Sequence, residues 1–336
     1  MAHCLVTGGA GFVGAHVAQT LADGGHSVVV LDDLSGGFVE NVPSEAKFVQ
    51  GSILDNTLIS GLFATEKFDY VYHLAAYAAE GLSHFIKRFN YANNVLGSVT
   101  LINAAVNNEV ECFVFTSSIA VYGAGQVPMS ESMRPEPEDS YGIAKFTVEQ
   151  ELEASKNMFD LDYVIFRPHN VYGELQNIGD RYRNVLGIFM NQILSGEPLS
   201  IFGDGEQTRA FSYIDDIAPA IANAPTTSGA RCEIFNVGAD APYTVNHLAD
   251  TVRVAMGVPE HPIRHLAARN EVLHAFSDHS KAQDVFGQQS ATSLEDGVGR
   301  MVKWVREHGP QPPSTFSSIE IQRNLPPFWS MAASNG

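Results

Sequence analysis

Short apolar runs and segments of helical spacing alternate through the first half of the chain. The apolar runs lie near residues 4–7, 26–31, 47–53, 69–76, 111–118 and 162–167. Helical patterns lie between them, near residues 13–21, 55–64, 89–106 and 140–158. Strands that alternate with helices in this way pair side by side in parallel. The pattern therefore predicts an α/β fold of the Rossmann type, a doubly wound parallel sheet with helices on both faces.

This alternation ends after Pro168. Short elements rich in Gly, Asn and Arg follow, whereas the stretch 209–222 and the apolar run 233–237 are typical of the first lobe again. The predicted division is a Rossmann domain over 1–170 plus about 209–237, a smaller, discontinuous substrate-binding lobe over 171–208 and 238–308, and an extended carboxy-terminal tail over 309–336. The aromatic residues Phe328 and Trp329 indicate that this tail docks on the protein.

Composition narrows the class of protein. The 336 residues are enough for two lobes, and 45% hydrophobic with 17% charged residues is typical of a globular protein. The net charge of −18 argues against a nucleic acid or an anionic membrane surface as a partner. No apolar run reaches about 18 residues, and the chain enters a strand at once, so we expect neither a transmembrane helix nor a signal peptide. Cys4, Cys112 and Cys232 are odd in number, which indicates reduced thiols and a cytoplasmic protein.

Glycines follow the first apolar run. Gly8, Gly11 and Gly14 have the spacing of a dinucleotide-binding loop. The tight turn needs φ > 0, a side chain would hold a pyrophosphate away from the backbone, and the next helix points its N–H groups at that pyrophosphate. The second apolar run ends at Asp32, at the spacing of a carboxylate that bonds both ribose hydroxyls. Because Asp32 would repel a 2′-phosphate and residues 33–35 include no arginine, the pattern predicts NAD rather than NADP.

A tyrosine and a lysine four positions apart begin a helical segment in the middle of the chain. Tyr141 and Lys145 lie on one helix face, and a cation beside a phenol lowers its pKa from about 10 and makes it a usable general base. Ser118 ends the preceding strand, at the carboxyl edge where doubly wound sheets bind ligands. The twelve histidines show no metal-ligand spacing, so we expect no metal site. His73 and His169 are expected to be structural or to line the pocket.

Together these motifs resemble the extended short-chain dehydrogenase/reductase family of nucleotide-sugar enzymes. The resemblance runs from residue 3 to about 305, and it rests on the glycine loop, the run His73–Ala76, Asn94, Ser118 and the Tyr141/Lys145 pair. It implies that Lys145 also bonds the nicotinamide ribose and that Asn94 holds the cofactor and the active-site loops. The further cofactor contacts that it implies are Phe12, Val13, Ser52, Ile53, Leu74, Ala75 and Ala76. The substrate contacts that it implies are Ser118, Tyr141, Asn170, Asn184, Val185, Ile201, Phe202, Arg209, Arg269 and Ala275.

Three positions depart from the family pattern. Gly51-Ser52 stands where the family has Gly-Asp after its third strand, so Ser52 or Asp55 would bond the adenine. Ala210 stands where the family's arginine motif continues into aspartate. The loop 77–85 lacks the lysine of some hexose epimerases and carries Glu80 instead. A carboxylate there would disfavour a uronic acid substrate if it faces the pocket, and the alternative is a solvated loop acid.

The residues after Ser118 discriminate among the reactions of the family. All members are expected to begin with proton transfer to Tyr141 while hydride passes from a sugar carbon to NAD. Dehydratases carry Asp-Glu after the serine or threonine and uronate decarboxylases keep a glutamate, whereas this chain has Ile119 and Ala120, which transfer no proton. Reductases of keto sugars typically use NADPH, against which Asp32 argues. The resemblance therefore implies an isomerase, an NAD-dependent 4-epimerase that acts on a UDP-hexose such as UDP-glucose or UDP-galactose through a transient 4-keto intermediate.

Two alternatives stay open, and two further properties follow from the resemblance. An epimerase acting at another carbon or on a CDP-, GDP- or dTDP-sugar is one alternative; a non-catalytic NAD-binding regulator is the other, although the intact catalytic residues argue against it. Ala275 aligns with a gatekeeper over the sugar that is a tyrosine in strict UDP-glucose/galactose epimerases, which predicts tolerance of N-acetylated sugars. A homodimer through a four-helix bundle is also implied, with apolar faces from Val95, Val99, Ile102, Val106 and Phe146.

Overall fold

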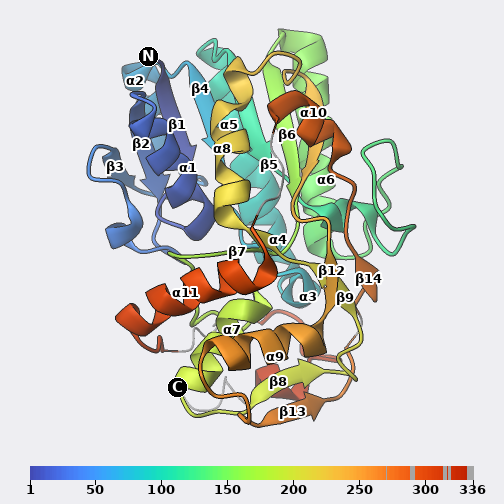
Figure 1. The fold of residues 1–336 in the computed structure, drawn as a ribbon. Helices are drawn as coiled ribbons and strands as arrows, with labels where there is room; N and C mark the ends of the chain where they lie inside the picture. The colour runs from blue at the N-terminus through green and yellow to red at the C-terminus, as the bar shows by residue number, and fades with distance from the viewer. Residues whose placement is uncertain (270, 288–291, 313–315, 317–318, 331–336) are drawn as a thin grey trace.

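One large parallel sheet forms the centre of the molecule. The computed structural model describes residues 1–269, 271–287, 292–312, 316 and 319–330. In spatial order, the strands of the sheet are β11 (Glu233–Val237), β6 (Asp162–Pro168), β5 (Cys112–Thr116), β4 (Tyr70–His73), β1 (His3–Thr7), β2 (Ser27–Asp32) and β3 (Lys47–Gln50) (Figure 1). Each neighbouring pair is parallel. The Rossmann-type fold predicted from the alternation is confirmed, and β11 joins the sheet although it lies about 65 residues beyond β6.

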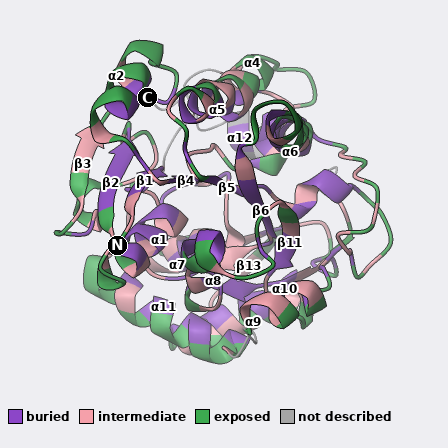
Figure 2. Cartoon of the chain, turned by 90° about the horizontal axis from the view of Figure 1, so that it is seen from above, coloured by how far each residue is buried: buried purple, intermediate pink, exposed green. Residues whose placement is uncertain are grey.

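Both faces of the sheet are covered by helices, because successive strand residues point to opposite sides. Val6 and Val30 pack on one face with Val17 of α1, whereas Leu5 and Val29 pack on the other. The helices of the first face are α1 (Phe12–Asp23) and α8 (Ala218–Asn223), and those of the second are α2 (Asn56–Glu66), α5 (Gly97–Asn107) and α6 (Ser140–Phe159) (Figure 2). With both faces covered, the inner strands are mostly apolar, and their carboxyl ends remain available to form a site.

The helical segment predicted at 89–106 contains a π-helical turn. It runs as α4 (Lys87–Tyr91), the π turn (Ala92–Leu96) and α5. The side chain of Asn94, inside the π turn, accepts a hydrogen bond from the Tyr77 N–H at 2.9 Å and so ties the loop after β4 to this helix. Ile102 is buried against the sheet, so it belongs to the core of its own subunit and not to a dimer face.

Short elements beneath the sheet form the second lobe (Figure 1). Its paired strands are β7 (Val171–Tyr172) with β10 (Ser212–Tyr213), β8 (Leu199–Phe202) with β13 (Ile263–Leu266), and β9 (Thr208–Ala210) between β12 (Pro242–Thr244) and β14 (His274–Ala275). The helices α7 (Val185–Leu194), α9 (Val245–Ala255) and α11 (Leu294–His308) lie with these strands, and α12 (Pro327–Ser330) belongs to the tail. The segment predicted for this lobe also contains α10 (Ser280–Phe286), which instead packs against β6 and β11 of the large sheet. Small strands and bent connections of this kind place side chains at the open end of the large sheet, where they face its carboxyl edge.

The carboxy-terminal tail docks on the loop that follows β4. Glu320 accepts hydrogen bonds from the backbone N–H groups of Arg88 and Phe89, at 2.8 and 2.9 Å. Trp329 is 3% exposed and packs against the same loop. The docking predicted from the aromatic residues is thus confirmed for Trp329, whereas the side chain of Phe328 lies outside the described part of the chain.

Across the described ranges, no helix combines the length and the apolar character needed to cross a membrane. The three cysteines are unpaired, and burial raises the pKa of Cys4 and Cys112 to about 12. These two thiols therefore stay protonated and behave as small apolar side chains.

Candidate functional site

A cavity of about 520 Å³ lies along the carboxyl edge of the sheet, between the sheet and the second lobe. Most of the predicted site residues line it: Gly8, Gly11, Phe12, Val13, Gly14, Asp32, Ile53, Leu74, Ala75, Ala76, Ser118, Tyr141, Lys145, Asn170, Asn184, Val185, Ile201, Phe202, Arg209, Arg269 and Ala275. Two predicted residues are not among the lining residues. Asn94 is buried behind the wall, where it holds the loop at Tyr77, and the Ser52 hydroxyl accepts a hydrogen bond from the Leu54 N–H.

The glycine loop fits the pyrophosphate of a dinucleotide. Gly8 has φ +71°, and a Cβ there would lie 2.6 Å from the Ala75 nitrogen, whereas a Cβ on Gly14 would lie 2.1 Å from the Gly8 oxygen. Only glycine allows β1, α1 and the end of β4 to approach so closely. No side chain caps α1 at Gly11, so the positive end of the helix faces the cavity with its first N–H groups available to an anion.

Asp32 lies at the end of β2, where a cofactor ribose would lie. Its two carboxylate oxygens accept hydrogen bonds from the N–H groups of Ala10 and Leu34, at 3.0 and 2.8 Å. Burial raises the pKa of Asp32, and these backbone hydrogen bonds oppose that shift. Each oxygen keeps lone pairs that face the cavity and fit two ribose hydroxyls.

The predicted catalytic residues come together just after β5, where Ser118 caps a short 3₁₀ turn, and on the first turns of α6. Asp139 caps α6 by accepting hydrogen bonds from the Tyr141 and Gly142 N–H groups, which fixes the first turn of the helix at the cavity wall. Burial raises the pKa of Tyr141, and a hydrogen bond with the Ser118 side chain lowers it. The ammonium group of Lys145 lies 5.7 Å from the centre of the Tyr141 ring. A phenol, a hydroxyl partner and a neighbouring amine on one wall can take a proton from a substrate alcohol.

A buried ion pair behind Lys145 was not anticipated from the sequence. The Lys145 amine donates to the Thr116 carbonyl at 2.7 Å, and burial lowers the pKa of Lys145 to about 7, while the negative charge of Glu149 raises it. Glu149 accepts two hydrogen bonds from Arg167 and one from Ser117. The i, i+4 spacing of Lys145 and Glu149 was visible in the sequence, but the long-range partner Arg167 on β6 was not.

Two arginines line the opposite end of the cavity. Arg209 donates to the carbonyls of Val272 and Leu273 and lies 3.5 Å from Glu271. Arg269 forms an ion pair with Glu271 at 3.0 Å, and its guanidinium lies 4.6 Å from the centre of the Phe202 ring. Guanidinium groups oriented in this way suit the oxygens of a diphosphate, since each fork can bond two oxygens at once.

Arg183 is a third arginine that lines the cavity, and sequence reasoning missed it. Its Nε donates to Asp180 at 2.6 Å, and its guanidinium lies 4.7 Å from the centre of the Tyr77 ring. A Cβ built on Gly36 would come within 2.6 Å of the guanidinium. Arg183 therefore connects the second lobe to the loop after β2, a contact between segments about 147 positions apart that no local spacing indicates.

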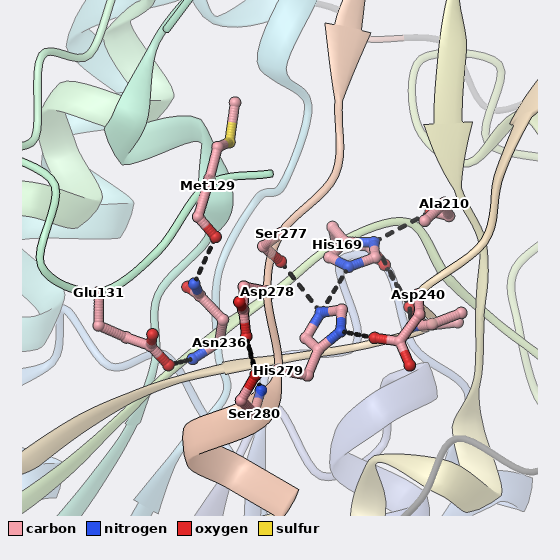
Figure 3. Close-up of polar contacts among 12 residues, drawn as sticks. Met129, Glu131, His169, Ala210, Asn236, Asp240, Ser277, Asp278, His279 and Ser280 are labelled. Carbon is pink, nitrogen blue, oxygen red and sulfur yellow. Dashed lines mark hydrogen bonds and ion pairs between the residues drawn. The ribbon is translucent and has the colours of Figure 1, made fainter. Parts of the chain in front are cut away.

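His169 lines the cavity, and its ring lies against that of His279, which belongs to the segment after β14 (Figure 3). Burial, together with His279, lowers the pKa of His169 to about 3, so its ring is neutral and its Nδ1 donates to the Ala210 carbonyl at 3.0 Å. Its Nε2 lies 3.0 Å from Nε2 of His279, which also bonds the Ser277 hydroxyl at 3.0 Å, while Nδ1 of His279 pairs with Asp240 at 2.7 Å. These contacts fix the loop beside β14.

His73 has a structural role. Its ring bonds the hydroxyls of Thr7 and Ser98, each at 2.8 Å, and burial, with the charge of Lys145, lowers the pKa of His73 to about 3. A search of the described residues finds no group of three or more His, Cys, Asp or Glu side chains arranged to hold a metal ion.

The fold and the cavity are those of an enzyme that binds a dinucleotide at the carboxyl edge of its sheet. The family model of the NAD dependent epimerase/dehydratase family matches residues 4–238. The chain belongs to this family, which confirms the predicted resemblance, the enzymatic character and NAD as the cofactor.

Known proteins of this family align with nearly the whole chain. UDP-glucose 4-epimerase of Mycolicibacterium smegmatis is 35% identical over 311 residues, covering 90% of this chain and 98% of its own. The crystal structure of UDP-glucose 4-epimerase from Thermotoga maritima with UDP-glucose matches with a TM-score of 0.86 and 34% identity, covering 91% of this chain and 99% of that one. The structure of UDP-glucuronic acid 4-epimerase from Bacillus cereus with UDP-glucuronic acid and NAD matches with a TM-score of 0.83, 29% identity and the same coverage.

Proposed function

We propose that the protein interconverts UDP-hexoses that differ in configuration at C4, through a transient 4-keto sugar. The observation that carries this proposal is the wall formed by Ser118, Tyr141 and Lys145, which faces the same cavity as the glycine loop and Asp32. The relatives named UDP-glucose 4-epimerase, which match 90–91% of this chain, support the reaction and the UDP-linked substrate.

In this proposal, residues of the cavity carry out the steps of the reaction. Tyr141 takes the proton of the sugar 4-hydroxyl, and Ser118 bonds the oxygen that loses it. Lys145, held by the Thr116 carbonyl, stabilises the phenolate and bonds the nicotinamide ribose. NAD, when bound, supplies a reversible hydride acceptor for the sugar carbon. After the keto sugar turns in the cavity, Tyr141 returns the proton to the oxygen on the epimeric carbon.

The side chains beside Ser118 favour epimerisation over elimination. Ile119 and Ala120 line the cavity directly after Ser118, and neither can donate or accept a proton. Loss of water from the keto sugar needs a positioned acid and a positioned base, so the keto sugar is reduced back instead. Ala275 also lines the cavity, and its methyl side chain leaves space for an N-acetyl group on the sugar.

The test is to incubate the NAD-loaded enzyme with UDP-glucose and to follow the anomeric protons by NMR. The expected result is a galacto-configured product without accumulation of NADH. Tyr141→Phe should keep NAD binding and lower turnover by ~10²–10⁴-fold, the range for loss of a general base. Near-normal turnover by Tyr141→Phe would contradict the assignment of the base. Parallel reactions with UDP-N-acetylglucosamine and with CDP-, GDP- and dTDP-glucose identify the preferred sugar and nucleotide.

Assembly and location form part of the same proposal. We propose a homodimer in which α4, the π turn and α6 pair with their symmetry mates, since Tyr91, Leu96 and Ile143 are apolar and exposed there. A mass of one subunit by light scattering would contradict the dimer.

The three unpaired cysteines support a cytoplasmic enzyme.

A further inference from the structure

Glu80 lies between the two functional ends of the cavity. It begins the short helix α3 (Glu80–Ser83) in the loop after β4, and its side chain is exposed to the cavity. This helix contacts both ends of the cavity: the Ser83 hydroxyl accepts a hydrogen bond from the Tyr141 N–H at 3.2 Å, and a Cβ on Gly81, the residue after Glu80, would lie 3.9 Å from a terminal nitrogen of Arg269. A sugar that reaches from the diphosphate end to the catalytic tyrosine therefore passes Glu80.

The arginine and lysine side chains that line the cavity already have partners. Arg209 and Arg269 share Glu271, Arg183 is paired with Asp180, and Lys145 donates to a backbone carbonyl. The ionisable groups that face Glu80 from the neighbouring elements are Asp139, Tyr141, Arg209, Arg269 and Glu271, and His84 lies on the same cavity wall. The carboxylate of a uronic acid placed beside Glu80 would be repelled by it, and no unpaired cation among the described residues of the cavity would compensate for that repulsion.

We propose that Glu80 selects the sugar, by accepting hydrogen bonds from hexose hydroxyls and repelling the carboxylate of a uronic acid. This inference rests on the proposed function and narrows its substrate to hexoses without an acid group. Overall similarity does not distinguish a neutral hexose from a uronic acid as the substrate, because relatives named for UDP-glucose and for UDP-glucuronic acid match the chain with similar coverage. In this proposal the charged side chain of Glu80 distinguishes the two sugars.

The carboxy-terminal tail holds this residue in place. A Cβ on Gly81, the residue after Glu80, would lie 3.2 Å from Cη2 of Trp329 and 3.9 Å from a terminal nitrogen of Arg269. Trp329 is buried, and it packs against Tyr182 and Phe85, with ring centres 5.6 and 6.1 Å apart. The backbone beside Glu80 is thus packed between the tail and Arg269, and Trp329 acts as a positioning residue for Glu80.

Equilibrium binding to the NAD-loaded Tyr141→Phe protein at pH 8 tests the selection without turnover. We expect UDP-glucose to bind about 100-fold more tightly than UDP-glucuronate, the ratio for two carboxylates about 6 Å apart at an effective dielectric constant of about 20. Adding Glu80→Gln should lower this ratio at least tenfold, mainly by tighter binding of UDP-glucuronate. Glu138→Gln is the matched control, since Glu138 is an exposed acid of the same cavity, and it should leave the ratio unchanged.

The outcomes separate this inference from the proposed function. Equal affinities for the two sugars, or a ratio that Glu80→Gln does not change, overturn the role of Glu80. Comparable turnover of UDP-glucuronate and UDP-glucose by the wild-type enzyme overturns it while leaving 4-epimerisation intact. If the expected binding ratio is found and the wild-type enzyme turns over neither sugar, the selection stands and the proposed reaction fails. Binding of neither sugar overturns both.

Two further readouts distinguish selection from a structural effect. The Glu80 carboxylate is open to the cavity, yet the protein around the cavity shields it from bulk solvent, and this desolvation, with the charge of Asp139, raises the pKa of Glu80 to about 7. As the pH falls from 8 to 6, Glu80 takes up a proton while a uronate stays ionised, so the ratio should fall in the parent protein and stay flat with Glu80→Gln. A ratio in the parent that does not change with pH contradicts the inference.

Trp329→Ala should lower the same binding ratio by loosening Glu80. Trp304→Ala, a matched change in α11 on the other side of the second lobe, should not. An unchanged ratio with Trp329→Ala would show that the tail does not position Glu80.

Discussion

Replacing Glu149 by glutamine should destabilise the protein and change the pH dependence of catalysis together. Glu149 is 4% exposed, and its carboxylate bonds Ser117 and the guanidinium of Arg167, which is itself 2% exposed. Arg167 further donates to the Tyr122 hydroxyl at 2.7 Å. Burial lowers the pKa of Arg167, but the hydrogen bonds and the negative charge of Glu149 outweigh this effect and raise the pKa of Arg167 above its usual value. Glu149→Gln keeps the shape of the side chain but leaves this cation buried without its counter-charge.

The expected loss follows from the burial of both partners. Removing one member of a buried pair costs about 3–5 kcal/mol, because the other charge stays desolvated. This is a large fraction of the ~5–15 kcal/mol by which folded proteins are stable. We therefore expect the urea midpoint of the NAD-free protein to fall by the equivalent of about 3 kcal/mol or more, with an unchanged slope. Glu153→Gln, one turn further along α6 and exposed, should change stability by no more than about 0.5 kcal/mol.

The pH profile separates a positioning role from a purely structural one. Glu149 raises the pKa of Lys145, so Glu149→Gln should lower it below the present value of about 7. Fewer Lys145 side chains are then charged at a given pH, and the loss of kcat/KM relative to wild type should be larger at pH 8 than at pH 6. A stability loss under about 1 kcal/mol would refute the energetic reasoning. A parallel loss of kcat/KM at both pH values would refute the link to Lys145.

Three further predictions concern the cofactor half of the site. Asp32→Ala should weaken NAD binding and relax discrimination against NADP, and an unchanged NAD/NADP preference in titrations would contradict the role of this carboxylate. Lys145→Met should stabilise the NAD-free protein more at pH 6 than at pH 9. Folding lowers the pKa of Lys145 from about 10.4 to about 7. Between these two pH values the unfolded chain binds more protons than the folded protein, so the stability of the wild type rises with pH. Urea unfolding at pH 6 and pH 9 measures this difference. Gly8→Ala should lower unfolding stability by about 2 kcal/mol or more, because φ is +71° and the new Cβ would meet the Ala75 nitrogen at 2.6 Å. Gly11→Ala, where the nearest atom is 3.1 Å away, should fold with near-normal stability and lose NAD affinity instead.

The fold was predictable from the sequence because its signals are local. Each strand is an apolar run and each covering helix has its own periodicity, so the alternation predicts the parallel sheet without any long-range information. The observed ends of the elements differ from the predicted ends by a few residues; β3, for example, ends at Gln50 and not at residue 53. The π turn at Ala92–Leu96 was missed, because hydrophobic spacing does not distinguish a π turn from the α-helix on either side of it.

In the site, too, features within one segment were predictable from the sequence, and contacts between distant segments were not. The glycine loop, Asp32 and the Tyr141/Lys145 pair are spaced along single elements, and the structure places them all at the cavity. Contacts between distant segments were missed, such as Arg167 on β6 with Glu149 on α6, and Arg183 of the second lobe with the loop after β2. The docked tail was anticipated only as an aromatic segment, and its partner could not be, since no spacing relates Trp329 to residue 85.

The local contacts determine the proposed reaction, and the contacts between distant segments determine the proposed choice of substrate. The proposed chemistry depends on groups at the ends of rigid strands and at the first turn of α6, where local geometry leaves little freedom. Selection of the sugar depends on Glu80, whose position is set by three segments far apart in the chain: the loop after β4, the arginine end of the cavity and the carboxy-terminal tail. A change in any one of them can alter the substrate while Ser118, Tyr141 and Lys145 stay in place. Relatives with the same fold and the same cofactor can therefore differ in the sugar they accept, and the loop with its tail is where that difference arises in this protein.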